Sequence, residues 1–274
     1  MRRHNSLRDD EAALTLTFPM RPLARIRDSV RQIGIGGTFV KILKYPFAWA
    51  ARNFADSRLA SLRTAEARFT WIYRKNYWQS SESASGDGST LGYTANLRKE
   101  LPALFEKFAI RSVLDAPCGD FNWMRELLRK VDVEYTGGDI VLPLIRSLNS
   151  QHGAPGRTFV HLDLVTGKLP KADLMICRDC LFHLSYADTR AVLENYLASG
   201  TAYLLTTTHK NRDGWLNQDI RTGFYRQIDL FAAPFNFSTA PLARIDDWVA
   251  PFPEREMCLW SRDQVATALG RSAN

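Results

Sequence analysis

The chain has 274 residues, 45% of them apolar, which is enough for one large α/β domain with an appendage. Its net charge of +7 is concentrated at the start, where residues 1–78 hold 15 Lys and Arg against 6 Asp and Glu, leaving 21 against 23 for the rest. Of its four cysteines only Cys177 and Cys180 lie close together, which argues against a zinc site or a disulfide scaffold and favours reduced thiols in a cytoplasmic protein.

Residues 1–77 are predicted to form a basic, helical N-terminal extension, and residues 78–274 the main domain. Residues 1–20 lack the uninterrupted apolar core of a secretory signal. The apolar stretch 33–51 is broken by Lys41, Lys44 and Pro46, so it is not a convincing membrane span. It could be an interfacial amphipathic helix with peripheral membrane contact, or a helix packed on the main domain or on a second subunit. A further basic helix is expected over residues 54–78.

The segment Ser80–Ser89 is rich in serine and glycine and has two possible roles. Its composition is typical of a flexible linker. Trp78 precedes it, however, and residues 94–108 follow as a predicted helix that leads directly into the first strand of the main domain. An ordered loop over a functional site is therefore the alternative, and both remain open at this point.

The main domain is organised around residues 110–123. Val113 and Leu114 continue an apolar run that suits a buried parallel strand, and the run stops at Asp115. Gly119 would let the backbone approach a ligand, and Asp120 could cap a helix whose apolar face begins at Trp123. This order of strand, tight loop and helix is half of a nucleotide-binding βαβ unit.

Acids follow the next predicted strands at the same spacing. Asp139 ends residues 134–139 and stands 24 residues after Asp115, where nucleotide-binding folds hold a ribose through its hydroxyl pair. Asp163 follows another strand-like segment after a further 24 residues. Because the carboxyl ends of parallel strands meet at one edge of a sheet, the three carboxylates are expected along that edge.

A fourth strand over residues 172–177 runs into a charged loop at Arg178 and Asp179. These two residues could simply form an ion pair with each other. His183 follows four residues later and can accept a proton near neutral pH, although it could equally cap or pack the next helix.

A helix over 186–198 and a strand over 201–209 come next. The irregular, aromatic-rich stretch 211–253 is interpreted as a substrate-facing cover, with strands predicted at 225–230 and 257–260 and a closing helix at 263–269.

The segment Asp115-Ala116-Pro117-Cys118-Gly119-Asp120 resembles motif I of the class I S-adenosylmethionine (SAM) dependent methyltransferases. It departs from the usual pattern, because Pro117 and Phe121 stand where glycines are common. Trp78 followed by Ser-x-Ser-Gly-x-Gly-Ser is similar to a segment that precedes this motif in one group of these enzymes. The resemblance spans residues 69–260 and implies a doubly wound, mostly parallel seven-stranded sheet.

The resemblance also implies a cofactor site for SAM. Motif I curls around the methionine part of SAM, the acid after the second strand holds the ribose, and the acid after the third meets the adenine amino group beside an apolar neighbour. The residues that inherit cofactor-binding roles are Asp115, Cys118, Gly119, Asp120, Trp123, Asp139, Ile140, Asp163, Leu164 and Arg178.

The expected activity is transfer of a methyl group from SAM to a small-molecule acceptor. The Asn-Pro-Pro-Tyr type of signature found in amine methylation is absent after the fourth strand, which favours an oxygen acceptor such as a hydroxyl of a sugar or secondary metabolite. His183 is the expected base, with Asp179 and His209 as the next candidates, and no metal is expected. Two alternatives stay open: a nucleic-acid methyltransferase that uses the basic extension, and a non-catalytic protein that binds a membrane or a partner.

Overall fold

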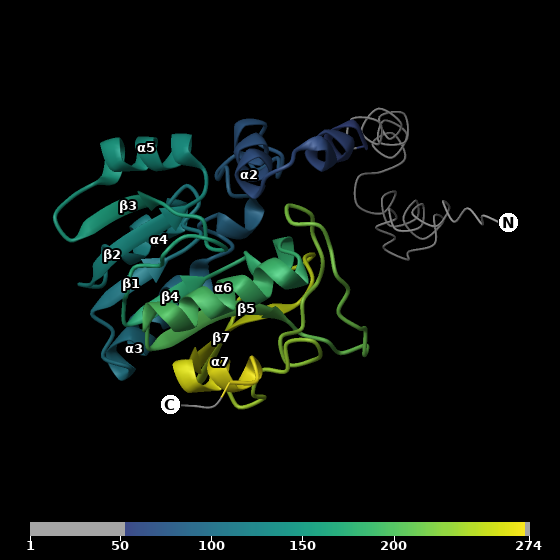
Figure 1. Cartoon of the computed structure of the whole chain (residues 1–274). Helices are drawn as coiled ribbons and strands as arrows, with labels where there is room; N and C mark the ends of the chain where they lie inside the picture. The colour runs from purple at the N-terminus through teal and green to yellow at the C-terminus, as the bar shows by residue number, and fades with distance from the viewer. Residues whose placement is uncertain (1–52, 272–274) are drawn as a thin grey trace, which may run out of the picture. The chain divides into compact units, whose positions relative to one another are not determined.

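The computed structural model describes residues 53–271 (Figure 1). The chain divides into two compact units, Met1–Arg58 and Leu59–Asn274, and the sheet with its helices belongs to the second. Most of the basic extension, including the apolar stretch 33–51, lies outside the described residues, so the predictions for it stay predictions. Within the described residues, no helix is long and apolar enough to cross a membrane.

The centre of the domain is a seven-stranded sheet with the order β3-β2-β1-β4-β5-β7-β6. Neighbouring strands from β3 to β5 are parallel, and β7 runs antiparallel to both β5 and β6. The order reverses between β1 and β4, which makes the sheet doubly wound as predicted. The strands are β1 (Ser112–Asp115), β2 (Glu134–Asp139), β3 (Arg157–His161), β4 (Leu174–Cys177), β5 (Tyr203–His209), β6 (Ala243–Asp246) and β7 (Arg255–Ser261).

Helices cover both faces of this sheet, and the alternation of side chains along each strand explains why. Val113 of β1 packs into one apolar core with α3, α4 and α5, while its neighbour Leu114 packs into a second core with α6 and α7. Phe69 of α2 contacts both cores. The helices are α2 (Ala65–Arg74), α3 (Ala95–Lys107), α4 (Asn122–Leu127), α5 (Leu142–His152), α6 (Tyr186–Ser199) and α7 (Arg262–Ala268).

Two predicted elements differ in the structure. The prediction of a strand at 225–230 is wrong, because β7 takes the position beside β5 and the sixth strand, at the sheet edge, is Ala243–Asp246. Residues 228–230 instead run past the end of β5, where the Leu230 N–H donates to Thr208 Oγ1 at 3.0 Å. The single helix predicted over 54–78 is also wrong. Helical residues 53–61 are separated from α2 by a break at which Thr64 caps α2, accepting from the Ala67 N–H at 3.1 Å.

Candidate active site

The loop after β1 brings the first two predicted acids together. Asp115 is buried and accepts a hydrogen bond from the Tyr135 hydroxyl at 2.8 Å, while burial raises the pKa of its carboxyl to about 7. Gly119 has φ of +53°, and its N–H donates to Asp139 Oδ2 at 3.1 Å. The positive φ explains why a glycine stands here. The loop therefore joins the carboxyl ends of β1 and β2, as the sequence predicted.

Asp139 keeps binding capacity although it is 7% exposed. Its Oδ1 accepts from the Val141 N–H at 2.9 Å, and its Oδ2 from the Gly119 N–H. A carboxylate can accept about four hydrogen bonds, and the backbone of Ile140 also acts on this one, so acceptor capacity remains. Ile140, next in the chain, is partly exposed at the same edge.

Asp163 lies two residues beyond the end of β3 and is occupied by its own turn. Its Oδ1 accepts from the Val165 N–H and its Oδ2 from the Thr166 hydroxyl, both at 2.8 Å. Leu164 beside it is buried. Both residues lie at the predicted edge of the sheet, and their contact with an adenine ring stays a prediction.

The segment 80–89, called the serine loop below, is an ordered loop that lies on the loop after β1. The Asp120 carboxylate accepts hydrogen bonds from Ser83 Oγ at 3.0 Å and from the Ala84 N–H at 2.8 Å. A Cβ atom on Gly119 would lie 2.2 Å from Ser85 Oγ. Asp120 also receives a longer bond from the Asn122 N–H at 3.4 Å, so its main role is to hold this loop rather than to cap α4.

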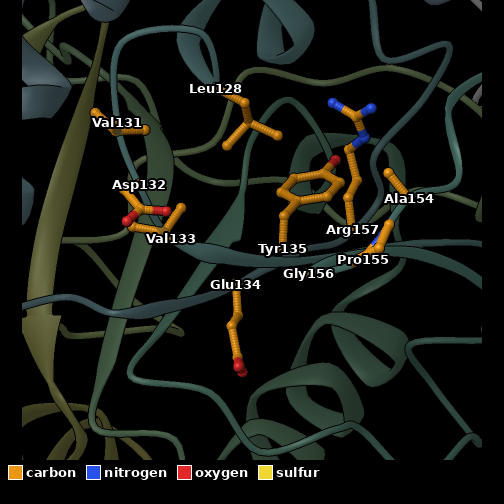
Figure 2. A pocket seen from close by; sticks show the side chains of 10 residues that line it. All are labelled: Leu128, Val131, Asp132, Val133, Glu134, Tyr135, Ala154, Pro155, Gly156 and Arg157. Carbon is orange, nitrogen blue, oxygen red and sulfur yellow. The ribbon is translucent and has the colours of Figure 1, made fainter.

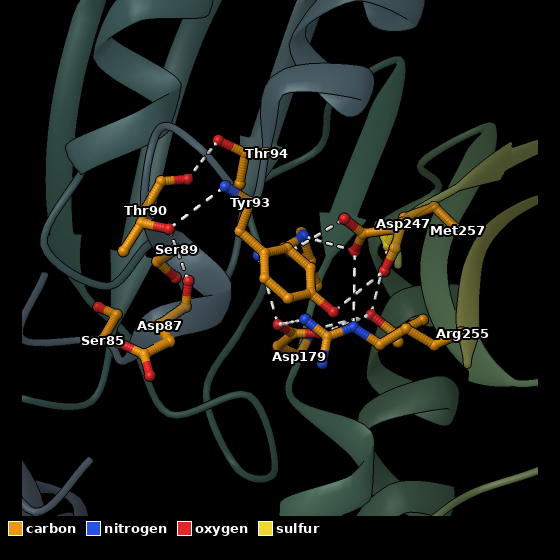
Figure 3. A network of polar contacts seen from close by, with 12 residues as sticks. Ser85, Asp87, Ser89, Thr90, Tyr93, Thr94, Asp179, Asp247, Arg255 and Met257 are labelled. Atoms are coloured by element: carbon orange, nitrogen blue, oxygen red, sulfur yellow. Dashed lines mark hydrogen bonds and ion pairs between the residues drawn. The ribbon is translucent and has the colours of Figure 1, made fainter. Parts of the chain in front are cut away.

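Arg178 and Asp179, the predicted charged loop after β4, form an ion-pair network with Asp247 and Arg255, and all of these except Asp179 are buried. Figure 3 shows Asp179, Asp247 and Arg255 of this network. Arg178 binds Asp247 through two hydrogen bonds, Nε–Oδ2 at 2.8 Å and Nη2–Oδ1 at 3.0 Å. Its Nη1 lies 3.3 Å from Asp179 Oδ2, and Arg255 Nη2 donates to that same oxygen at 2.8 Å. Although burial opposes it, the attraction of the two guanidinium groups holds the pKa of Asp179 below its usual range.

Aromatic rings and a glycine enclose this network. The Arg255 guanidinium carbon lies 4.6 Å from the centre of the Tyr93 ring, and that of Arg178 lies 5.7 Å from the Trp123 ring. Gly88 of the serine loop packs so closely that a Cβ there would lie 2.8 Å from both Arg255 Nη2 and Asp179 Oδ2. The serine loop thus contacts the loops after β1 and β4 together.

His183 is oriented by the backbone of the irregular stretch. Its Nδ1 lies 2.8 Å from the Phe224 carbonyl oxygen, which can only accept, so Nδ1 carries the proton. Burial lowers the pKa of His183 to about 4, so the ring is neutral at pH 7 and Nε2 holds a lone pair. The free lone pair can accept a proton, although a pKa of about 4 lies below the value near the operating pH that suits a general base best.

A pocket of about 260 Å³ lies elsewhere, at the amino ends of β2 and β3 (Figure 2). Glu134 and Arg157, the first residues of those strands, line it together with Leu128 and Pro155. The acids Asp115 and Asp139 end their strands and so belong to the opposite edge of the sheet. This pocket is therefore separate from the candidate active site.

No family model and no curated protein matches the sequence, but solved structures match the fold. One is the 1,6-didemethyltoxoflavin-N1-methyltransferase of Burkholderia thailandensis, solved with 1,6-didemethyltoxoflavin and S-adenosylhomocysteine (SAH). It is 17% identical to this chain with a TM-score of 0.51, and the match covers 73% of this chain and 92% of that one. PigF, solved with SAH, is 14% identical with a TM-score of 0.52, over 84% of this chain and 74% of that one.

The chain has the class I SAM-dependent methyltransferase fold. The sheet order with a single reversed strand and the acids at the strand ends agree with the resemblance seen in the sequence. Within this methyltransferase fold, Cys118 and Trp123 are buried beside the loop after β1. All four cysteines are free, and the described residues hold no cluster of three or more His, Cys, Asp or Glu that could bind a metal.

The sequence-based prediction missed three residues of this candidate site: Tyr93, Asp247 and Arg255. Asp247 directly follows β6 and Arg255 begins β7. The mistaken strand at 225–230 hid both, because correct placement of β6 and β7 would have put an Asp and an Arg beside the end of β5. Tyr93 carried no comparable signal in the sequence.

Proposed function

We propose that this protein is a SAM-dependent methyltransferase that methylates an oxygen atom of a small-molecule acceptor. The observation that carries the proposal is the pair formed by Asp139 and Gly119. The carboxylate ends β2, binds the N–H of the glycine loop, and retains acceptor capacity. A hydroxyl pair, as on a ribose, is the group that such a carboxylate holds in nucleotide-binding folds.

The surrounding residues fit the remaining parts of SAM. Gly119, Cys118 and Asp120 form the loop that would receive the methionine part, and Asp163 with Leu164 would receive the adenine. When bound, SAM supplies a methyl group on a sulfonium; the S–CH₃ bond breaks as the O–CH₃ bond forms, and the bonding pair returns to sulfur. The chain's own residues then have to align the acceptor and exclude water.

His183 is the proposed general base. With its proton on Nδ1, the Nε2 lone pair can accept the proton of an acceptor hydroxyl as that oxygen is methylated. Asp179 suits this role less well, since its carboxylate is engaged by Arg178 and Arg255. We assign Asp179 the positioning of the loop that carries His183, rather than proton transfer.

Calorimetric titration of SAM tests the proposal without a known acceptor. Asp139→Ala should lower the affinity at least tenfold, which is about 1.4 kcal/mol. Asp132→Ala is the matched control, since Asp132 precedes β2 at the opposite edge of the sheet and should leave the affinity unchanged. His183→Ala should also retain SAM binding. No measurable SAM binding by the unmodified protein, or equal affinities for the two aspartate variants, would contradict the assignment.

A further inference from the structure

A second hydroxyl group lies beside the proposed base and has a fixed orientation. Tyr225 comes from the irregular stretch after β5, and its ring centre lies 5.9 Å from that of His183. Its hydroxyl oxygen lies 3.4 Å from Nε2 of His209, the last residue of β5. His209 is 1% exposed, whereas Tyr225 and His183 are both partly exposed.

The hydrogen bonds of His209 determine where the Tyr225 proton points. The Ile228 N–H can only donate, and it donates to His209 Nδ1 at 3.2 Å. Because burial lowers the pKa of His209 to about 4, the ring is neutral and its proton is on Nε2. His209 therefore donates to the Tyr225 oxygen, and the tyrosine's own proton is directed away from His209.

The result is a hydrogen-bond donor and an acceptor on two rings whose centres lie 5.9 Å apart. Tyr225 offers an O–H, and His183 offers the lone pair of Nε2. Aromatic rings surround them: the Trp78 ring centre lies 4.9 Å from that of His183 with an angle of 33° between the planes, and Phe182 lies 5.5 Å from Tyr225. A flat ring suits such surroundings better than a flexible polar chain does.

We propose that Tyr225 and His183 together select an aromatic acceptor that carries two oxygen atoms on adjacent ring positions. Tyr225 donates to one oxygen, while His183 Nε2 takes the proton of the other as it is methylated. This inference rests on the proposed function and adds the acceptor class to it. In the transfer, the acceptor oxygen gains the methyl group of SAM and loses its proton to His183, and SAM leaves as S-adenosylhomocysteine.

The test measures S-adenosylhomocysteine release with three probes: catechol, whose hydroxyl groups are adjacent, resorcinol, whose hydroxyl groups are not, and phenol. The unmodified protein should methylate catechol at least about tenfold faster than either other probe, the factor that corresponds to one hydrogen bond of about 1.4 kcal/mol. Tyr225→Phe should remove this preference and leave SAM affinity unchanged, while the melting temperature falls slightly because the buried His209 Nε2–H loses its acceptor. His209→Asn, whose side-chain oxygen can still accept from the Ile228 N–H, should weaken the preference partially.

Tyr196→Phe is the matched control. It also removes a hydroxyl from a buried tyrosine, but one that lies on α6 without a hydrogen-bond partner among the described residues. It should keep the full preference for catechol. Three results would overturn this inference and leave the proposed function standing. The SAM-binding protein could fail to methylate catechol, the three probes could react at equal rates, or Tyr225→Phe could keep the preference for catechol. Absence of SAM binding would overturn both.

Discussion

Replacing Asp120 with alanine should release the serine loop from the loop after β1. The Asp120 carboxylate accepts from Ser83 Oγ at 3.0 Å and from the Ala84 N–H at 2.8 Å. A hydrogen bond to a charged group contributes about 1.5–3 kcal/mol. The lower figure for both bonds gives about 3 kcal/mol, which corresponds to a roughly 150-fold rise in the population of the released loop.

Hydrogen exchange measured at single amides is the appropriate assay, because the loop can open while the sheet stays folded. The amides of Ala84 and Ser85 should exchange about 100-fold faster in Asp120→Ala than in the unmodified protein. Asp87→Ala is the control: Asp87 belongs to the same loop and carries the same charge, but it accepts from Thr90 through its backbone carbonyl, which alanine retains. Exchange within about threefold of the unmodified protein in Asp120→Ala, or equal acceleration in the control, would refute the argument.

Two other perturbations have defined outcomes. Asp247→Asn should lower the free energy of unfolding by about 3–5 kcal/mol in denaturant titrations, because it removes the charge that Arg178 binds in the protein interior. The control Asp246→Asn removes only a partly exposed ion pair with Lys210 and should lower it by less than about 1 kcal/mol. Equal losses in the two variants would contradict this. Burial lowers the pKa of His209 to about 4, below its value in the unfolded chain. Its contribution to the free energy of unfolding is therefore complete above about pH 6.5 and is lost as the pH falls toward 4. Between pH 7 and 5 that loss is about 2 kcal/mol. The melting temperature should therefore depend less on pH in His209→Asn than in the unmodified protein. The same pH dependence in both proteins would show that His209 does not contribute in this way.

The sequence was sufficient to place Asp115 and Asp139 at the ends of their strands because that placement is local. Asp115 ends a short apolar run and Asp139 ends the strand-like segment 134–139, and parallel strands bring such ends to one edge of the sheet. Gly119 was identifiable for the same reason, since a tight turn after a strand needs its freedom at positive φ. These predictions depended on residues within one βαβ unit.

The acceptor side was not predictable because its contacts join distant parts of the chain. Arg178 is fixed by Asp247, 69 residues later, and no local pattern pairs them. The stretch 211–242 lacks strand periodicity. Its backbone groups form hydrogen bonds with side chains where a strand would bond to a neighbouring strand, as the Leu230 N–H does with the Thr208 hydroxyl. The segment 80–89 is an ordered loop rather than a linker because Asp120 binds it. Asp120 is 35 to 37 residues away in the sequence, so no local pattern could have predicted this contact.

The serine loop connects the two sides of the site through two glycines. At one end, Ser85 fills the space where Gly119 lacks a side chain, and at the other, Gly88 lies directly against Arg255 and Asp179. Neither contact leaves room for a Cβ atom, so the loop lies directly against both sides of the site. We therefore expect opening at Asp120 to uncover the ion-pair network as well. A substitution on the cofactor side should for this reason alter acceptor turnover as well as SAM affinity.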